Sequence, residues 1–498
     1  MTEFELKLEI PAHRAQAVAA AVRRGRTSRQ RLQARYFDTR DRALAARGIV
    51  VRLRKEGRQW VQTAKAASGR GALERLEHNV LLAARPTPAP DLARHAGTPL
   101  GKHIQQALKL KPDEPFPALE PVYQTDIVRL SRAVRKGSST VEIALDTGRV
   151  LAGDRSVPVN ELELELKKGN PADAVELARR WCLARGLWIS VVSKSMRGQR
   201  LAAGQDFGVA VNARTPTFKR DACGYDMTAA VVSSCLDQIL PNASDIAAGC
   251  TQAEHIHQLR VGLRRLRTAM RELGAWMPGF DRTLEEPLVA AFRDLGQHRD
   301  RCHLVDTVQK QIAAAGGPPL DWTGSMTRLP NVGASVRSLA FQKAVLGLIA
   351  FVHAAPQEAA SRETTKATAA PRKIVRKRLD NLHRRLVAGG RQFLNLEEPA
   401  RHSLRKQAKR LRYLIEFAQP LFDAHKVEAY VSALKPVQDA LGSYHDELAA
   451  LEAWQQLATQ DPRAWFGLGW LSARRPANAQ ACLQACETFA NQAKPAWD

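Results

Sequence analysis

The sequence predicts a multidomain α+β protein, with a β-rich N-terminal half and an all-α C-terminal half. Its 498 residues are too many for one compact core, so we expect two or three domains. Before about residue 205, apolar and polar residues alternate with a period of two, which is typical of half-buried strands. After about residue 222 the period becomes helical, in long segments rich in Ala, Leu and Arg.

The strands of the N-terminal half carry their charges on one face. In residues 3–10, Glu3, Glu5 and Lys7 share a face, and apolar residues occupy the other. The further segments with this alternation are residues 50–54, 141–146 and 161–167. Several such strands can close into a barrel with charges inside and apolar residues outside, where helices or the second half must cover them.

Two helices are expected within this half. One lies near residues 14–24 and the other near residues 171–186, with Asn170 as its N-cap. The polar, irregular stretch at 206–222 predicts the domain boundary, and residues 354–372 read as a linker within the helical half.

A lumen lined by both acids and bases needs a ligand that satisfies both. Carboxylates can hold Mg²⁺ or Mn²⁺, which prefer oxygen donors. Arginines and lysines can hold the non-bridging oxygens of a polyphosphate. A complex of a metal ion with a triphosphate meets both requirements at once.

The helical half contains an internal repeat. Each copy has a basic stripe with residues spaced by three, four and three, so the stripe lies along one helix face. The two stripes are His257, Arg260, Arg264 and Arg267, and His402, Arg405, Lys409 and Arg412. Each stripe is followed by a Leu-Gly pair that leads to an aspartate, Asp300 in the first copy and Asp446 in the second. Two coupled motifs that recur in order indicate a duplicated helical bundle.

The stripes favour an anionic ligand over a solvated surface. Like charges three or four residues apart repel one another on an isolated helix, so an unrelieved stripe suggests a compensating anion. The alternative, two ordinary solvated faces, stays open. His257 and His402 either pack locally or donate to phosphate. Asp300 and Asp446 are expected to pair with these arginines or to shape a turn.

Composition agrees with a polyanionic partner. The formal net charge of +25 indicates nucleic acid, an acidic membrane surface or polyphosphate, and charge alone does not choose among them. Only 6% of the residues are aromatic, which weakly disfavours base stacking. The seven scattered cysteines predict free thiols in a reducing compartment. Without a signal-peptide pattern or an apolar run of roughly 18 to 20 residues, a cytoplasmic protein is expected.

An ordered set of motifs covers residues 1–200. The motifs are Glu3-x-Glu5-x-Lys7, Tyr36-Phe37-Asp38-Thr39, Arg52-x-Arg54, Lys65, Arg75-x-Glu77, ALDTG at 144–148, ELELELK at 161–167 and Ser193-Lys194-Ser195. Together they resemble the CYTH family, the triphosphate tunnel metalloenzymes. The resemblance implies an eight-stranded antiparallel β-tunnel that hydrolyses inorganic or thiamine triphosphate, or cyclises ATP.

The resemblance also implies roles for individual residues. The catalytic residues would be Glu3, Glu5 and Lys7. The metal ligands would come from Glu3, Glu5, Glu161, Glu163 and Glu165. The substrate-binding residues would be Arg52, Arg54, Lys65, Arg75, Arg129 and Lys194. One departure from the family pattern is Asn79, where many relatives carry an acid that could serve a second metal site.

The helical motifs resemble the CHAD domain. They are HQLRVGLRRLR at 257–267, LGQHRD at 295–300, HSLRKQAKRLRY at 402–413 and LGSYHD at 441–446. This resemblance implies that both basic stripes bind inorganic polyphosphate. We expect a CYTH domain over 1–205, a linker over 206–222 and a CHAD domain over 223–492, with repeats at about 223–350 and 372–492.

The leading function is hydrolysis of inorganic triphosphate with Mg²⁺ or Mn²⁺. The alternatives are a hydrolase of an organic triphosphate such as thiamine triphosphate or ATP, an adenylate cyclase, or a non-catalytic protein that binds polyphosphate, in association with polyphosphate granules. Specific recognition of nucleic acid is not expected, since no helix-turn-helix, RRM or zinc-finger signature occurs.

Overall fold

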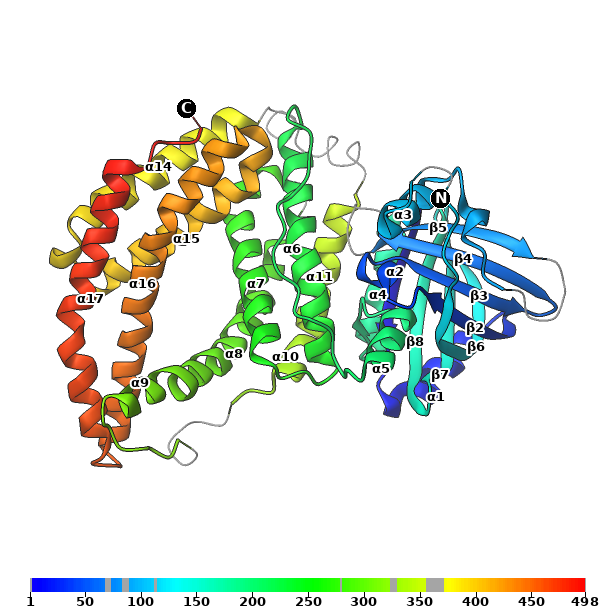
Figure 1. The fold of residues 1–498 in the computed structure, drawn as a ribbon, viewed down its shortest axis with the longest axis horizontal. Helices are drawn as coiled ribbons and strands as arrows, with labels where there is room; N and C mark the ends of the chain where they lie inside the picture. Colours follow the sequence, from blue (N-terminus) through cyan, green and yellow to red (C-terminus); the bar gives the residue numbers. More distant parts are fainter. Residues whose placement is uncertain are drawn as a thin grey trace.

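A β-barrel and a helical domain lie side by side in the protein (Figure 1). The computed structural model describes residues 2–67, 73–82, 89–111, 114–277, 280–322, 329–354 and 371–497. The side chains of Glu3 and Arg75 lie outside the described part, as does most of the linker expected at 354–372. This arrangement confirms the predicted fold class.

Eight antiparallel strands close the barrel. In chain order they are β1 (Thr2–Glu9), β2 (Ser28–Asp38), β3 (Val50–Glu56), β4 (Gln59–Ala67), β5 (Glu74–Leu82), β6 (Glu120–Lys136), β7 (Ser139–Ala152) and β8 (Arg155–Lys168). The strand order is β5-β4-β3-β2-β6-β7-β8-β1, and the pairing of β1 with β5 joins the two ends. A ninth strand, the two-residue β9 (Trp188–Ile189), pairs with β1 at Leu8 and Glu9, beyond the part of β1 that pairs with β5. The expected count of eight therefore holds for the closed barrel, and β9 adds one.

Alternation along β1 separates the lumen from the outer face. Leu6 and Leu8 are fully buried on the outside, whereas Glu5 and Lys7 line the lumen. The outer face packs against α1 (Ala15–Val22) and α4 (Pro171–Arg185), the two helices predicted in this half. The Asn170 side chain caps α4 by accepting a hydrogen bond from the amide of Ala172 at 3.0 Å, which confirms the predicted N-cap.

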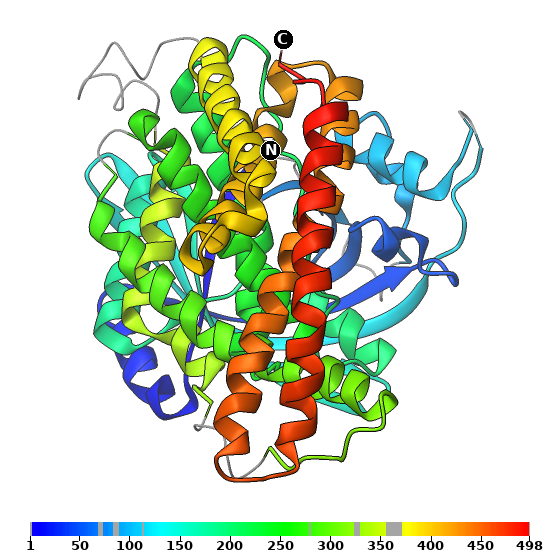
Figure 2. The same ribbon diagram turned by 90° about the vertical axis from the view of Figure 1, so that its left-hand side faces the viewer.

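Eight long helices form two similar groups in the helical domain. The first group is α6 (Gly224–Ala247), α7 (Ala253–Leu273), α8 (Glu285–His303) and α11 (Leu339–Val352). The second is α14 (Pro371–Arg391), α15 (Glu398–Ala418), α16 (Ala424–Ala458) and α17 (Ala464–Gln492). Helices α7 and α15, which carry the two basic stripes, pack against each other at the centre of the domain. Figure 2 shows the long α16 and α17 running alongside each other on the face away from the barrel.

The barrel docks on α6 and α11 through one continuous apolar core. Polar contacts fix the docking at the chain segment that follows β9. The amide of Ile189 donates to Oε1 of Gln342 at 2.8 Å, and the amide of Val191 donates to Oγ of Ser244 at 3.1 Å. This segment leads directly into α5 (Lys194–Ala203), whose first residue points into the barrel.

Candidate active site and polyanion cleft

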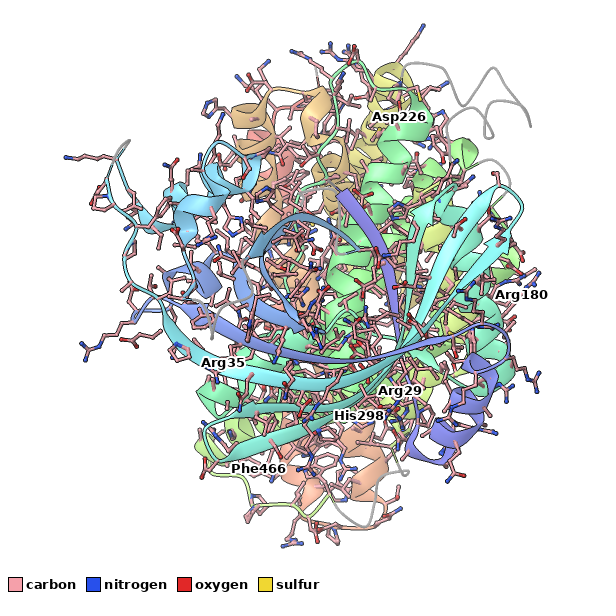
Figure 3. The ribbon with its side chains drawn as sticks, turned by 90° about the vertical axis from the view of Figure 1, so that its right-hand side faces the viewer. Arg29, Arg35, Arg180, Asp226, His298 and Phe466 are labelled. Atoms are coloured by element: carbon pink, nitrogen blue, oxygen red, sulfur yellow. The ribbon has the colours of Figure 1, made fainter. Side chains whose placement is uncertain are left out.

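The lumen of the barrel is a cavity of about 750 Å³ with two walls of opposite charge. Strands β3, β4 and β6 contribute the basic side chains of one wall. These are Arg52, Arg54, Lys65 and Arg129. Strands β1, β7 and β8 contribute the main acids of the other wall. These are Glu5, Glu142, Asp146, Glu163 and Glu165. The outward residues of β2, such as the exposed Arg29 and Arg35 in Figure 3, alternate with lumen residues and lie on its other face.

Three buried carboxylates converge on the acidic wall. Oxygens of Asp146, Glu161 and Glu163 all lie within 4.8 Å of one another, and Asp146 and Glu161 are fully buried. Register explains the convergence, because Asp146 of β7 faces Glu161 of β8 directly. The resemblance did not select Asp146 as a ligand. The sequence did contain a signal for Asp146 as a lumen acid, because it lies in the ALDTG motif on the same strand face as Glu142.

The ammonium group of Lys194 lies at the point where these carboxylates meet. Its Nζ is 2.6 Å from Oδ2 of Asp146, 2.6 Å from Oε1 of Glu161 and 2.7 Å from Oε1 of Glu163. Arg129 approaches from the side and donates two hydrogen bonds of 2.7 Å to Asp146, while it also contacts Glu163. Both cations therefore contact acids of the opposite wall.

These contacts shift the pKa values of the groups involved. Burial alone would lower the pKa of Lys194, but the three carboxylates raise it well above its usual range. Burial would raise the pKa of Glu163, but Lys194 and Arg129 hold it well below its usual value. Glu5 behaves differently, since burial and the nearby Glu163 raise its pKa to about 7. Glu165 lies next along the same wall and pairs with Lys167 at 2.5 Å.

Lys7 is a buried cation with little direct compensation. Its side chain is 9% exposed, and its Nζ is 3.5 Å from Oε2 of Glu161 and 3.8 Å from Oε1 of Glu9. Within the described part of the chain, this nitrogen has no hydrogen-bond partner. Burial lowers its pKa. An unbonded, buried ammonium beside the cavity is suited to an anionic ligand.

Aromatic side chains support the basic wall. Burial would raise the pKa of Tyr36, but the adjacent Arg52 outweighs burial and lowers it. Tyr36 stacks on Tyr123 with ring centroids 4.5 Å apart, and the Tyr123 hydroxyl is 2.8 Å from Oγ of Ser195. These contacts connect Arg52 with the start of α5.

The remaining basic-wall residues have acidic neighbours of their own. Nε of Arg54 donates to Glu56 at 2.5 Å, and Lys65 pairs with Glu77. Asn79, the departure from the family pattern, lines the cavity and donates to Oε1 of Glu77 at 2.9 Å. An amide at this position hydrogen-bonds to an acid and adds no carboxylate oxygen.

The acidic wall fits a divalent cation. Its donors are carboxylate oxygens from three strands, the ligand type that Mg²⁺ and Mn²⁺ prefer. The three oxygens that lie within 4.8 Å of one another already surround one cationic nitrogen. Glu5, whose pKa is raised by burial and by the nearby Glu163, stands beside them as a further donor.

The helical domain brings its two stripes together in a cleft of about 230 Å³. Five of the predicted stripe residues are joined there by residues of α8 and α16. The predicted residues in the cleft are His257, Arg260, Arg264, Arg405 and Lys409. The added ones are Arg299, Asp300, His303, His445 and Asp446. Asp446 accepts from Arg299 at 2.8 Å and lies 3.8 Å from Arg405, so it pairs with these arginines as expected.

Three predicted stripe residues lie outside this cleft. Arg267 faces Glu285 at 3.8 Å, and Arg412 donates to Glu416 at 2.7 Å. His402 borders a neighbouring pocket of about 170 Å³, with its ring centroid 4.7 Å from that of His445. The last residue of each stripe is therefore paired with an acid, whereas the arginines and the lysine at the centre of the stripes are concentrated in the cleft.

Concentration of charge in the cleft disfavours protonation of its bases. Burial, followed by Arg264 and Arg405, lowers the pKa of Lys409 to about 6. Burial and neighbouring arginines lower the pKa of Arg260 to about 10. Burial and Arg405 lower the pKa of His445 to about 4. A bound anion would reverse these shifts, so the cleft is electrostatically prepared for one.

No helix in the described part of the chain is both long and apolar enough to cross a bilayer.

The chain is similar to known proteins over parts of its length. The inorganic triphosphatase of Haemophilus influenzae is 30% identical over 175 residues, which cover 34% of this chain and 46% of that relative's length. A CHAD domain from Ricinus communis has a TM-score of 0.46 at 24% identity, over 58% of this chain and 99% of that one. A putative adenylyl cyclase from Hippeastrum, described as having a dominant triphosphatase activity, has a TM-score of 0.30 at 13% identity, over 41% of this chain and 96% of that one.

Family models match both parts of the chain: that of the CYTH domain matches residues 1–198 and that of the CHAD domain matches residues 230–455. With an antiparallel barrel whose lumen is charged, and a helical domain built around two basic stripes, the chain is a CYTH domain followed by a CHAD domain.

Proposed function

We propose that the CYTH domain, residues 1–205, hydrolyses inorganic triphosphate to pyrophosphate and phosphate with Mg²⁺ or Mn²⁺. The observation that carries the proposal is the pair of opposed walls in the lumen, one basic and one acidic. A triphosphate carries four or five negative charges, which the basic wall can bind. A divalent ion held by the acidic wall would add positive charge on the side of the triphosphate that faces the carboxylates. The 30% identity to an inorganic triphosphatase supports the same chemistry.

Each wall has a separate task in this reaction. Arg52, Arg54 and Lys65 bind non-bridging oxygens of the triphosphate, and Lys7 donates to the phosphoryl group that is transferred. Asp146, Glu161, Glu163 and Glu5 would hold the divalent ion, whose chemistry is to neutralise the charge that develops on the phosphoryl oxygens.

The bond changes are those of an in-line displacement. The oxygen of water forms a bond to the terminal phosphorus, and the bridging P–O bond breaks with its electron pair leaving on pyrophosphate. The carboxylate of Glu5 accepts a hydrogen bond from the attacking water and so orients it. Protons of the water pass to solvent and to the phosphate product.

Phosphate release from inorganic triphosphate tests the proposal. The purified full chain is assayed with Mg²⁺, with Mn²⁺ and with EDTA, in parallel with ATP, thiamine triphosphate, pyrophosphate and long-chain polyphosphate. We expect metal-dependent turnover of inorganic triphosphate above the other substrates, and a loss of about 100-fold or more in Glu5→Gln and Arg52→Gln. Arg31→Gln is the matched control, because Arg31 pairs with Asp126 on the outer face of β2. Preferred turnover of ATP or thiamine triphosphate would instead assign an organic substrate.

We propose that the CHAD domain, residues 223–492, binds inorganic polyphosphate in the cleft between α7 and α15. The support is a row of half-buried bases that outnumber the acids of the cleft, which among the described residues are Asp300 and Asp446. A flexible chain of phosphates presents regularly spaced oxygens to such a row without any need for base or sugar contacts. This cleft would also place the protein on polyphosphate granules.

Two arginines of the same helix provide the test of the cleft. Arg405 lines it, whereas Arg412 pairs with Glu416 outside it. We expect Arg405→Gln to weaken polyphosphate binding by at least about 10-fold, which corresponds to one charge-assisted contact. Arg412→Gln should change the affinity little. Equal losses in the two variants would assign binding to a diffuse basic surface, and competition with DNA at physiological salt distinguishes nucleic acid as the ligand.

A further inference from the structure

We propose that Lys194 occupies the position of the divalent ion in the metal-free protein and leaves it when the ion binds. This inference rests on the proposed metal site of the tunnel. It assigns two alternating partners to the Lys194 side chain. Without the ion the partner is the acidic wall, and with the ion bound the partner is the triphosphate.

The geometry of the ammonium group is that of a bound cation. The Nζ of Lys194 donates hydrogen bonds to Glu161 and Glu163 at 2.6 and 2.7 Å, and it forms an ion pair with Asp146 at 2.6 Å. The same residues, Asp146, Glu161 and Glu163, are those whose oxygens lie within 4.8 Å of one another. Because an ion would need these oxygens at about 2.0 to 2.6 Å, it and the ammonium cannot share the position.

Electrostatics explains why a cation is needed there without metal. Asp146 and Glu161 are fully buried, and neighbouring buried carboxylates repel one another unless a cation lies between them. Arg129 supplies part of the compensation through its two hydrogen bonds to Asp146. Arg197 and Lys7 lie 3.0 and 3.5 Å from Oε2 of Glu161, but among the described cations Lys194 alone contacts all three carboxylates.

The attachment of Lys194 allows its side chain to move while its backbone stays fixed. It is the first residue of α5, where Ser193 caps the helix by accepting from the amide of Met196 at 3.2 Å. Ser193 and Ser195 line the same cavity, so the start of the helix faces the space that a triphosphate would fill. A four-carbon stem with freely rotating bonds can carry the ammonium from the acids to a phosphate oxygen.

Displacement has a thermodynamic consequence. A metal ion that binds the protein alone must displace a well-bonded ammonium group, which lowers its affinity. When triphosphate is present, the displaced ammonium gains a new anionic partner. Metal and triphosphate therefore favour each other's binding, and by linkage the coupling is equal in both directions.

Mn²⁺ binding to the full chain without triphosphate tests the inference. The free ion is measured by its paramagnetic resonance signal during titration of wild type, Lys194→Met and Lys65→Met. We expect Lys194→Met to bind Mn²⁺ at least about 10-fold more tightly than wild type, because the competing ammonium is gone. Lys65→Met also removes one positive charge from the lumen, but Lys65 pairs with Glu77. The change in Mn²⁺ affinity in Lys65→Met, which measures the general influence of one lost charge, should be smaller than that in Lys194→Met.

Thermal unfolding provides a second readout. Metal-free Lys194→Met should melt at a lower temperature than wild type. Addition of Mn²⁺ should raise the melting temperature of the variant by more than it raises that of wild type. If Lys194→Met does not fold, Lys194→Gln takes its place and should show the same differences from wild type in Mn²⁺ affinity and melting temperature. An affinity for Mn²⁺ equal to or weaker than that of wild type in both variants would overturn the role of Lys194 alone. Absence of Mn²⁺ binding by wild type as well as the variants would overturn the metal site and, with it, this inference.

Discussion

Asp146 serves two cations at once. It accepts two hydrogen bonds from Arg129, forms an ion pair with Lys194 at 2.6 Å, and is fully buried. Removing the charge of Asp146 takes away the carboxylate that accepts the paired hydrogen bonds of Arg129. It also removes one carboxylate donor from the acidic wall. The residue therefore links the substrate-binding wall with the proposed metal site.

Asp146→Asn should reduce metal-dependent phosphate release by about 100-fold and weaken Mn²⁺ binding, because an amide oxygen is a poorer ligand than a carboxylate. Both quantities are measured on the same preparations of full-length protein. Asp126→Asn is the control, since Asp126 is an acid of β6 that pairs with Arg31 away from the lumen. Unchanged Mn²⁺ affinity in Asp146→Asn would remove this residue from the set of ligands.

The proposed binding of polyphosphate should depend on pH through Lys409. Burial and neighbouring arginines lower its pKa to about 6, so in the free cleft it is charged below pH 6 and neutral above it. A bound polyanion favours the charged form, so binding takes up a proton above pH 6. Affinity should therefore be highest at pH 5.5 and fall as the pH rises to 7.5, by up to about 10-fold per unit.

Lys409→Arg separates charge from its titration. Because a guanidinium stays protonated over this range, the variant should keep tight binding at pH 7.5 and lose most of the pH dependence. Affinities are compared by titration calorimetry with long-chain polyphosphate at constant ionic strength. If the affinity of Lys409→Arg falls with pH as steeply as that of wild type, the pH dependence belongs to the histidines of the cleft. Among these, burial and Arg405 lower the pKa of His445 to about 4.

At the scale of elements, two helix N-caps of the barrel domain differ in what they support. Asn170 caps α4 on the outer face of the barrel, and Ser193 caps α5 beside the lumen. Replacing either with alanine should cost about 1 kcal/mol in the free energy of unfolding, as is usual for N-caps. Denaturant unfolding of both variants measures this cost.

Only the cap beside the lumen should affect the reaction. Ser193→Ala frays the turn that carries Lys194 and should lower phosphate release several-fold, whereas Asn170→Ala should leave it unchanged. If the two variants lose activity in proportion to their stability alone, the position of α5 is not critical for the site.

The sequence predicted elements better than contacts between them. The alternation of β1 identified its lumen face, and the Asn-Pro start of residues 170–171 identified the beginning of α4, because both signals are local. The encounter of Lys194 with Asp146 depends on the closure of the barrel, which no local pattern encodes. The same is true of Arg299, which joins the cleft from α8 and binds Asp446 of α16.

At the scale of the whole molecule, the docking of the two domains buries charge. Arg200 of α5 donates to Asp245 of α6 at 2.6 Å, and the Asp245 side chain is only 4% exposed. The neighbouring amide of Val211 donates to Oδ1 of Asn242 at 3.1 Å, so the segment between the domains, which has no helix or strand, also packs against α6. With a continuous apolar core, the two domains should unfold as one unit.

Calorimetry tests this cooperativity. Wild type should show one transition, and Arg200→Gln should destabilise the protein by about 3 to 5 kcal/mol, because the buried Asp245 loses its guanidinium partner and retains the amide of Gly208 and the ring of His255 as neighbours. Reduced docking should separate the transition into two. Two independent transitions in wild type would contradict a shared core.

The balance of charges in the lumen bears on how the substrate arrives. Among the described residues, seven basic and seven acidic side chains line the cavity, in a chain whose net charge is +25. These described side chains therefore contribute almost nothing to the long-range field, and steering of anions toward the protein comes from the remainder of the surface. Added salt should slow the association of polyanions with the helical domain, while the affinity of triphosphate for the tunnel, where charges meet at contact distance, should respond much less.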